Sequence, residues 1–164
     1  MRIFQVILAV VLAMSLAGCS SKFKTYYGPE VTRVVVQKGE RKMYLLHHGK
    51  VLKQYNIGLG FAPEGDKKIK GDGKTPEGDY VIDRRNPNSK FHLSLGISYP
   101  NEHDIAEALA LGEDPGGDIF IHGKPRKYRD APRDWTWGCI AISDRQMERV
   151  YAMVKDGTPV SIRP

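Results

Sequence analysis

Short runs of β-branched and other apolar residues, separated by turn-forming residues, dominate the chain after about residue 30. The turn-like His48-Gly49-Lys50 separates two of these runs and predicts an N-terminal hairpin or meander. Strands are predicted over residues 31–37, 43–47, 51–57, 79–83, 91–98, 118–122, 139–142 and 159–162. The pattern therefore predicts a β-rich α+β domain in which strands outnumber helices.

Two helices are predicted among these strands. Asn101 can cap the first, which ends at Ala110 and has Asp104 at its third position. Ser143 and Gln146 form a capping box at the start of the second. The apolar stripe of the second helix has the i, i+3, i+4, i+7 spacing and comprises Met147, Val150, Tyr151 and Val154. The second helix is therefore expected to bury one face.

The N-terminus has the pattern of an export signal. Residues 3–16 are apolar except at two positions, and this run is shorter than the roughly twenty residues that a membrane-spanning helix needs. We therefore interpret residues 1–18 as a signal peptide that is removed. Leu16-Ala17-Gly18-Cys19 resembles the bacterial lipobox, which implies that Cys19 is lipid-modified and begins the mature protein. The alternative is an ordinary secreted protein in which Cys19 is a stray thiol.

The residues after Cys19 bear on location and domain boundaries. Ser20 resembles the pattern of lipoproteins that are sorted to the outer membrane of Gram-negative cells. The expected location is the periplasmic face of the cell envelope, lipid-anchored to a membrane, with the outer membrane favoured over the inner. Residues 19–30 have no apolar period and are interpreted as a tether, so the domain is predicted to span residues 31–164.

Composition and charge narrow the function classes. The 164 residues are 41% apolar and 27% charged, which suits one globular domain, and two cysteines exclude a disulfide-dense scaffold. Without Arg2 the chain keeps 24 basic and 19 acidic residues, and the basic residues form no long run. Dispersed charge in an exported protein argues against a nucleic-acid partner. An anionic polymer of the cell envelope is the expected counterpart.

A glycine-rich segment precedes the strand predicted at residue 79. Residues 70–78 include Gly71, Gly73, Pro76 and Gly78, which predict a loop with demanding backbone geometry. The segment lacks the spacing of a phosphate-binding P-loop, and no helix pattern follows it. Two interpretations remain open: a tight turn before the strand, or a turn that also forms one wall of a cleft.

Two reactive side chains stand at the boundaries of short apolar strands. His122 ends one strand, and Cys139 begins another, seventeen positions later. A nearby imidazole can take the proton of a thiol and stabilise the thiolate, so the pair is a candidate nucleophile and base. The His and Cys spacings typical of zinc sites are absent, and neither a metal nor another cofactor is expected. The alternative is a buried cysteine and a structural histidine without a catalytic role.

The motifs around this pair are similar to those of a known enzyme family. Ile121-His122-Gly123, followed by Thr136-Trp137-Gly138-Cys139-Ile140, resembles the signature of the L,D-transpeptidase (YkuD-like) catalytic domain. The 71–78 segment resembles the Thr-Pro-x-Gly region of that family, and residues 31–162 can be aligned with it in order. Trp137 stands where histidine is common, and Ala141 stands where asparagine or arginine often follows. The resemblance implies mixed β-sheets or a β-sandwich with two short helices packed on it.

The resemblance also implies a reaction on peptidoglycan stem peptides. Cys139 would attack the bond between the diamino acid and D-Ala, while His122 acts first as base and then as acid. The acceptor would be an amine of another stem or the lysine of an envelope lipoprotein. Thr136 is expected to orient His122. The expected oxyanion donors are the backbone N–H groups of Trp137, Gly138 and Cys139.

Five further residues are candidates for substrate binding. Basic side chains of the loop between His122 and Thr136 could meet the carboxylates of the stem, aromatic faces could line the cleft, and glycine permits close approach of a substrate. The candidates are Tyr99, Gly123, Arg126, Arg133 and Trp135.

Other functions are compatible with the same residues. A hydrolase could use the Cys-His pair, either as an L,D-carboxypeptidase or as an amidase that releases anchored lipoprotein. A non-catalytic peptidoglycan-binding lipoprotein would not need the pair at all. A papain-like peptidase is disfavoured, because its cysteine precedes its histidine along the chain and here the order is reversed.

Overall fold

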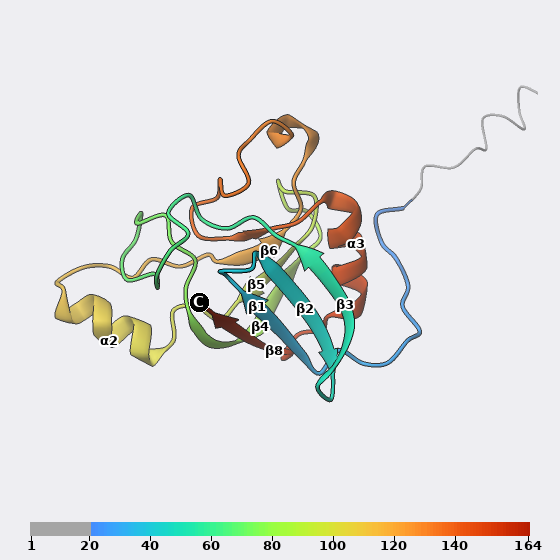
Figure 1. Ribbon diagram of the computed structural model, residues 1–164, viewed down its shortest axis with the longest axis horizontal. Helices are drawn as coiled ribbons and strands as arrows, with labels where there is room; N and C mark the ends of the chain where they lie inside the picture. The colour runs from blue at the N-terminus through green and yellow to red at the C-terminus, as the bar shows by residue number, and fades with distance from the viewer. Residues whose placement is uncertain (1–20) are drawn as a thin grey trace, which may run out of the picture.

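One curled sheet organises the computed structural model, which describes residues 21–164 (Figure 1). Within these residues the strand order is β3-β2-β1-β8-β4-β5-β6-β7. Most neighbours pair antiparallel, but β1 pairs parallel with β8, and β6 pairs parallel with β7. The strands are β1 Arg33–Gln37, β2 Lys42–His47, β3 Lys50–Asn56, β4 Gly78–Asn86, β5 Ser94–Ile97, β6 Phe120–His122, β7 Ile140–Ala141 and β8 Pro159–Arg163.

The long strand β4 joins the two halves of the sheet. Its first four residues pair with β8, and the rest pair with β5, with a register shift between Ile82 and Arg84. A bulge of this kind bends a strand and increases its twist. The two ends of the curled sheet also meet, because Gly58, just beyond β3, pairs with Ala141 of β7. The cleft described below lies in the β5–β6–β7 half of this sheet.

Alternating apolar residues give the sheet its buried face. In β1 and β2 the inward positions follow the period of two expected for a strand. These fully buried residues are Val34, Val36, Met43 and Leu45. α3 (Asp144–Met153) packs next to β5 and buries Met147, Val150 and Met153. The core therefore lies between the sheet and α3.

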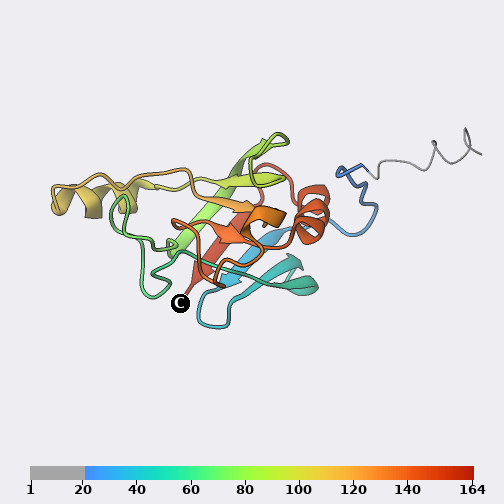
Figure 2. The ribbon, with the colours of Figure 1, turned by 90° about the horizontal axis from the view of Figure 1, so that it is seen from above.

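The other helix, α2 (Glu102–Ala110), projects from one end of the sheet in both ribbon views (Figures 1 and 2). Its buried Asp104 accepts hydrogen bonds from the hydroxyl of Tyr80 at 3.1 and 3.2 Å and from the N–H of Asn101 at 2.9 Å. Burial raises the pKa of both Asp104 and Tyr80. α2 is thus attached to the sheet by a buried polar contact as well as by apolar packing of Ala108.

The predicted elements are confirmed, with shifts at their ends. Both helices begin with the predicted capping boxes, Asn101 with Asp104 and Ser143 with Gln146. The strand predicted over 91–98 starts later, because residues 91–93 form a bend before β5. The strand predicted over 139–142 covers only Ile140–Ala141, because the chain turns at 136–139.

The predicted signal peptide (1–18) and Cys19 lie outside the described residues. The described part of the predicted tether, residues 21–30, has no helix or strand but contacts the domain. Lys22 Nζ donates to the carbonyl oxygens of Pro87 at 2.6 Å and His92 at 3.2 Å, and Tyr26 packs against the core. Across residues 21–164 no helix has the length and apolar character needed to cross a membrane.

Leu95 offers a test of the packing in the curled sheet. It is 0% exposed in β5, so Leu95→Ala is expected to lower the free energy of unfolding by about 2–5 kcal/mol through the cavity it leaves. Leu109→Ala, at a position of α2 that is 68% exposed, is the matched control and should change it by less than about 0.5 kcal/mol. Urea unfolding followed by circular dichroism measures both, and equal effects would contradict the placement of Leu95 in the core.

Candidate active site

Neighbouring strand ends bring His122 and Cys139 to one cleft. In the parallel β6–β7 pair His122 lies opposite Ala141, and Cys139 precedes β7 by one residue. The side chains of His122 and Cys139 both line a cleft of about 510 Å³. Polar residues of segment 86–94 line it as well, namely Asn86, Asn88, Ser89, Lys90 and Ser94.

His122 is buried and held in one orientation. Its Nδ1 lies 2.7 Å from the carbonyl oxygen of Gly123, and because a carbonyl only accepts, Nδ1 carries the proton and Nε2 is left as an acceptor. The ring stacks on Phe91 at 4.4 Å and meets the edge of Trp135 at 5.8 Å between centroids. Burial lowers the pKa of His122, and the hydrogen bond with Gly123 opposes this effect only in part.

Cys139 is a protonated thiol in this environment. Burial raises the pKa of Cys139 to about 11, and the negative charge of Asp118 adds to this effect. A hydrogen bond from the backbone of Phe120 and the positive charges of Lys67 and Arg84 act in the opposite direction. The thiol donates to the carbonyl oxygen of Asp118, 3.5 Å from Sγ. The thiol of Cys139 is therefore neutral at pH 7.

Both members of the pair are thus uncharged at neutral pH. Burial disfavours the thiolate of Cys139 and the imidazolium of His122 for the same reason, the loss of hydration of a charge. A thiolate can form here when a base takes the proton, and Nε2 of His122, which lines the same cleft, is left as a proton acceptor. The arrangement suits nucleophilic attack coupled to proton transfer. In the part of the chain that the structure describes, no group of three or more His, Cys, Asp or Glu could hold a metal ion.

The turn before Cys139 is held by Thr136. Its hydroxyl donates to the carbonyl oxygen of Cys139 at 2.6 Å and accepts the N–H of Gly138 at 3.2 Å. Thr136 therefore holds the turn through these two bonds, whereas the sequence predicted that it would orient His122. The Gly138 N–H, one of three predicted oxyanion donors, is used inside the turn. Gly138 has φ +119°, and a Cβ there would lie 2.6 Å from the carbonyl oxygen of Lys74.

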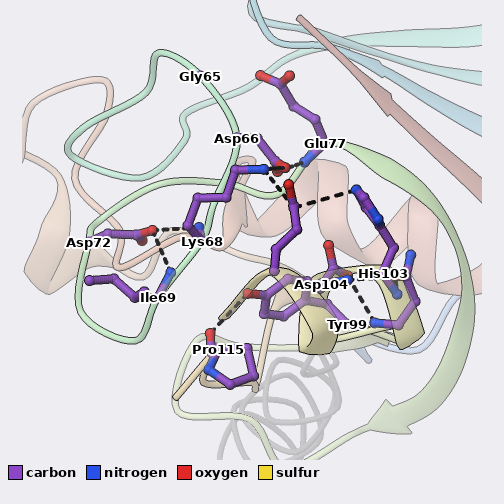
Figure 3. Close-up of polar contacts among 12 residues, drawn as sticks. Gly65, Asp66, Lys68, Ile69, Asp72, Glu77, Tyr99, His103, Asp104 and Pro115 are labelled. Atoms are coloured by element: carbon purple, nitrogen blue, oxygen red, sulfur yellow. Dashed lines mark hydrogen bonds and ion pairs between the residues drawn. The ribbon is translucent and has the colours of Figure 1, made fainter. Parts of the chain in front are cut away.

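The glycine-rich segment lies behind this turn and is organised by Asp72. The carboxylate accepts hydrogen bonds of 2.9–3.2 Å, two of which are drawn in Figure 3. The donors are the N–H groups of Lys68, Ile69 and Lys74 and the ammonium of Lys67. Burial acts to raise the pKa of Asp72, but these bonds together outweigh it and lower the pKa. The segment is therefore a fixed support for the turn at Gly138.

This segment also forms one wall of a second cleft. Lys70 and Gly71 line it together with Trp137, and its volume is about 570 Å³. Lys68, just before the segment, pairs with Glu107 of α2 at 2.6 Å and with the neighbouring Asp66 at 2.8 Å (Figure 3). Of the two interpretations of the glycine-rich segment, the structure supports the one that makes it a cleft wall.

Comparison with known proteins places this site in a family. Residues 31–162 match the model of the YkuD L,D-transpeptidase catalytic domain. The chain belongs to the L,D-transpeptidase catalytic domain family. The predicted family and fold class are both confirmed by this match and by the solved structures that resemble the chain.

Individual relatives are longer than this chain. It is 29% identical over 121 residues to the putative L,D-transpeptidase YafK of Escherichia coli K12, covering 73% of this chain and 41% of that protein. The crystal structure of the helical cell shape determining protein Pgp2 from Campylobacter jejuni is 30% identical, with a TM-score of 0.65, and covers 91% of this chain and 53% of that one. Bd1075 of Bdellovibrio bacteriovorus is 22% identical, with a TM-score of 0.58, covering 82% and 48%. The chain thus spans about half the length of these relatives.

Three of the predicted substrate-binding residues of this L,D-transpeptidase domain lie near His122 or in the core. Trp135 contacts the His122 ring directly. Gly123 is buried, and a Cβ there would clash with the carboxylate of Asp144. Tyr99 is 4% exposed in the core and donates to the carbonyl oxygen of Pro115 at 2.9 Å (Figure 3), so it does not line the catalytic cleft.

The two predicted arginines lie in a separate cavity of about 470 Å³. Arg126 and Arg133 line it with Lys124, Arg129 and one side of Trp135, whereas neither Cys139 nor His122 does. Arg133 is fixed by a hydrogen bond from its Nε to the carbonyl oxygen of Ile57 at 3.2 Å. The basic loop therefore contacts His122 through Trp135, and its two arginines do not line the cleft of Cys139.

Sequence reasoning missed four residues of the L,D-transpeptidase site. Phe91 stacks on His122, and Tyr128 stacks on Trp135 at 4.5 Å, which completes an aromatic layer around the base. The backbone groups of Asp118 and Phe120 flank the thiol. The aromatic side chains of Phe91 and Tyr128 were a sequence signal from which this aromatic layer could have been predicted. The backbone contacts of the thiol have no sequence signal, because any residue type supplies them.

The protonation state of Cys139 can be read from its reactivity. In a Cys19→Ser background, where Cys139 is the only thiol, the logarithm of the iodoacetamide alkylation rate is expected to rise with unit slope up to pH 9.5 without a plateau, because the thiol pKa is raised to about 11. Alkylation followed by mass spectrometry measures it. A plateau near pH 7 would show a preformed thiolate and contradict the expectation.

Thr136 can be tested with a pair of variants. Thr136→Val keeps the shape but leaves the Cys139 carbonyl and the Gly138 N–H without their partner, so the free energy of unfolding should fall by about 1–3 kcal/mol. Thr136→Ser keeps the hydroxyl and should cost about 1 kcal/mol or less. Thermal unfolding compares the two. Equal losses in both variants would show that the hydroxyl does not hold the turn.

Proposed function

We propose that this protein is a peptidoglycan L,D-transpeptidase that works through a thioester on Cys139. Sγ attacks the carbonyl carbon between the diamino acid and D-Ala of a stem peptide, and the thiol proton passes to Nε2 of His122. His122 then gives this proton to the leaving amine of D-Ala, and a thioester remains. An acceptor amine attacks the thioester and loses a proton through His122 to the departing sulfur. The products are an amide cross-link and the free thiol.

One observation carries this proposal. The only cysteine in residues 21–164, just before β7, and a buried histidine of β6 with a free Nε2 line the same cleft. A neutral thiol that needs a base to react matches a chemistry in which attack and proton transfer are coupled. The oxyanion of the tetrahedral intermediate would be bound by the N–H groups of Trp137 and Cys139, because the Gly138 N–H is held by Thr136.

The same proposal assigns the substrate-binding groups. The amide and hydroxyl side chains of segment 86–94 would pair with the stem backbone in the catalytic cleft. Arg126 and Arg133 would bind a carboxylate of the stem that extends into the basic cavity, with Trp135 between the two sites.

We further propose a lipid-anchored protein at the periplasmic face of the envelope, in the outer membrane rather than the inner. The apolar run of 3–16 followed by Cys19 supports this location. Lys22, three residues after Cys19, binds carbonyl oxygens of Pro87 and His92 at the rim of the catalytic cleft. Three residues reach at most about 10 Å, so the anchor would keep the cleft close to the membrane. A role in cell shape, by similarity to the helical cell shape determining protein Pgp2, is part of this proposal.

Acylation by a carbapenem tests the proposed nucleophile. Intact-mass spectrometry is expected to show one adduct on the protein and none on Cys139→Ser. Cys19→Ser is the matched control, because it removes the other cysteine and should acylate normally. His122→Ala should slow acylation by about 100-fold or more. An adduct that persists in Cys139→Ser would refute the assignment.

Purified muropeptides then separate the candidate reactions. Formation of 3-3 linked dimers supports transfer to a stem amine. Trimmed tripeptides alone would indicate an L,D-carboxypeptidase. Release of a lipoprotein from intact peptidoglycan that carries it, assayed in parallel, would indicate an amidase. If neither a product nor a carbapenem adduct forms, the remaining interpretation is a non-catalytic peptidoglycan-binding protein.

A further inference from the structure

Two large aromatic side chains stand exposed beside the catalytic turn. Trp137 is 70% exposed and Phe61 is 48% exposed, and their rings meet edge to face at 4.9 Å between centroids. Trp137 is two residues from Cys139 in the chain, and the catalytic chemistry described above makes no use of its indole ring. Exposed aromatic surface of this kind is costly in water and marks a place where a ligand or partner packs.

The aromatic pair rests on a rigid base. A Cβ at Gly73 would clash with the Phe61 ring, so the ring lies directly on the backbone of the glycine-rich segment. The N–H of Phe61 donates to the carbonyl oxygen of Thr136 at 2.9 Å, which ties it to the catalytic turn. Because the Phe61 ring is seated on backbone in the free protein, a ligand that packs on the pair does not have to order this ring.

The cleft beside Trp137 is polar but carries no excess charge. The ammonium of Lys67 is paired with Asp72 at 2.9 Å, and Lys70 is paired with Asp114 at 3.7 Å. Asp118, also in its lining, is paired with Arg84 at 3.1 Å. The charges of Lys67 and Lys70 in the lining are therefore balanced by those of Asp114 and Asp118, in contrast to the basic cavity around Arg126 and Arg133. The cleft suits a neutral ligand with many hydrogen-bonding groups.

The second cleft also adjoins the catalytic one. Asp118 lines both, and its carbonyl oxygen accepts the hydrogen bond of the Cys139 thiol. A ligand stacked on Trp137 would therefore lie next to a substrate bound at Cys139.

We propose that Phe61 and Trp137 form a stacking surface for a neutral N-acetylated aminosugar of a glycan chain. The apolar C–H face of the sugar ring would pack on the indole, and its hydroxyl and acetamido groups would pair with the polar lining of the second cleft. This inference rests on the proposed action on peptidoglycan, and it adds that the enzyme binds the glycan as well as the stem peptide. Membrane insertion of the two rings is the competing explanation, and the charged side chains around them argue against it.

Binding of tetra-N-acetylchitotetraose to the full-length Cys139→Ala protein tests the inference. Isothermal titration calorimetry should detect binding, and saturation-transfer NMR should show contacts to the sugar C–H groups. Trp137→Ala and Phe61→Ala are each expected to weaken binding at least tenfold. Trp137→Leu keeps an apolar contact with Phe61 but lacks the flat face, and it should also lose binding. Tyr27→Ala, which removes another aromatic residue that is 93% exposed, is the matched control and should bind as the parent does.

Other outcomes would overturn the inference. Equal affinity in the parent and in correctly folded Trp137→Leu, or no binding at millimolar saccharide, would exclude the stacking surface. In a Cys19→Ser background, which removes the proposed lipid anchor, binding of the parent but not of Trp137→Ala to phosphatidylethanolamine–phosphatidylglycerol vesicles, without saccharide binding, would assign the pair to the membrane. Since the Cys139→Ala protein cannot form a thioester, saccharide binding is measured independently of carbapenem acylation. A failure of the proposed chemistry is thereby distinguishable from a failure of glycan recognition.

Discussion

Parallel pairing of β6 with β7 is the constraint on which the catalytic cleft depends. The two strands are only three and two residues long, so few backbone hydrogen bonds hold them together. Ile121 and Ile140 lie opposite each other in this pair, and both are fully buried. Burial of these side chains contributes about 25 cal/mol per Å² of apolar surface. It therefore supplies much of the stability that a longer ladder of backbone hydrogen bonds would give. No hydrogen bond between His122 and Cys139 is needed to bring the two together.

Close contact between backbones is the second requirement of the site. A Cβ at Gly60 would clash with the carbonyl oxygen of Gly73 and lie 3.1 Å from the N–H of Gly138. Three segments that are distant in the sequence thus meet without side chains between them. The half-buried thiol of Cys139 lies just after Gly138, and burial raises its pKa. The same packing seats the Phe61 ring on the backbone of Gly73.

Local signals in the sequence were sufficient to predict the elements and to identify His122 and Cys139 as a candidate pair, which the structure brings to one cleft. Capping residues, turn glycines and strand alternation each depend on neighbours within a few positions, and His122 and Cys139 lie within a recognisable motif. Contacts across the fold were not predictable in this way. Thr136 has a hydroxyl that could serve either His122 or the turn, and only the folded backbone decides. Tyr99 and Arg126 fell outside the catalytic cleft, because spacing along a loop does not encode which wall a side chain reaches.

The closure of the curled sheet limits how a substrate can be held. The outer edge of β7 is already paired, because Gly58 and Ala141 exchange two backbone hydrogen bonds of 2.9 and 2.8 Å. An extended peptide cannot add itself to this edge as a further strand, although it would lie within reach of the nucleophile. The main chain of a substrate therefore cannot pair with the main chain of β7. Selectivity for the substrate must come from side chains that line the clefts, and these can change in evolution without disturbing the sheet.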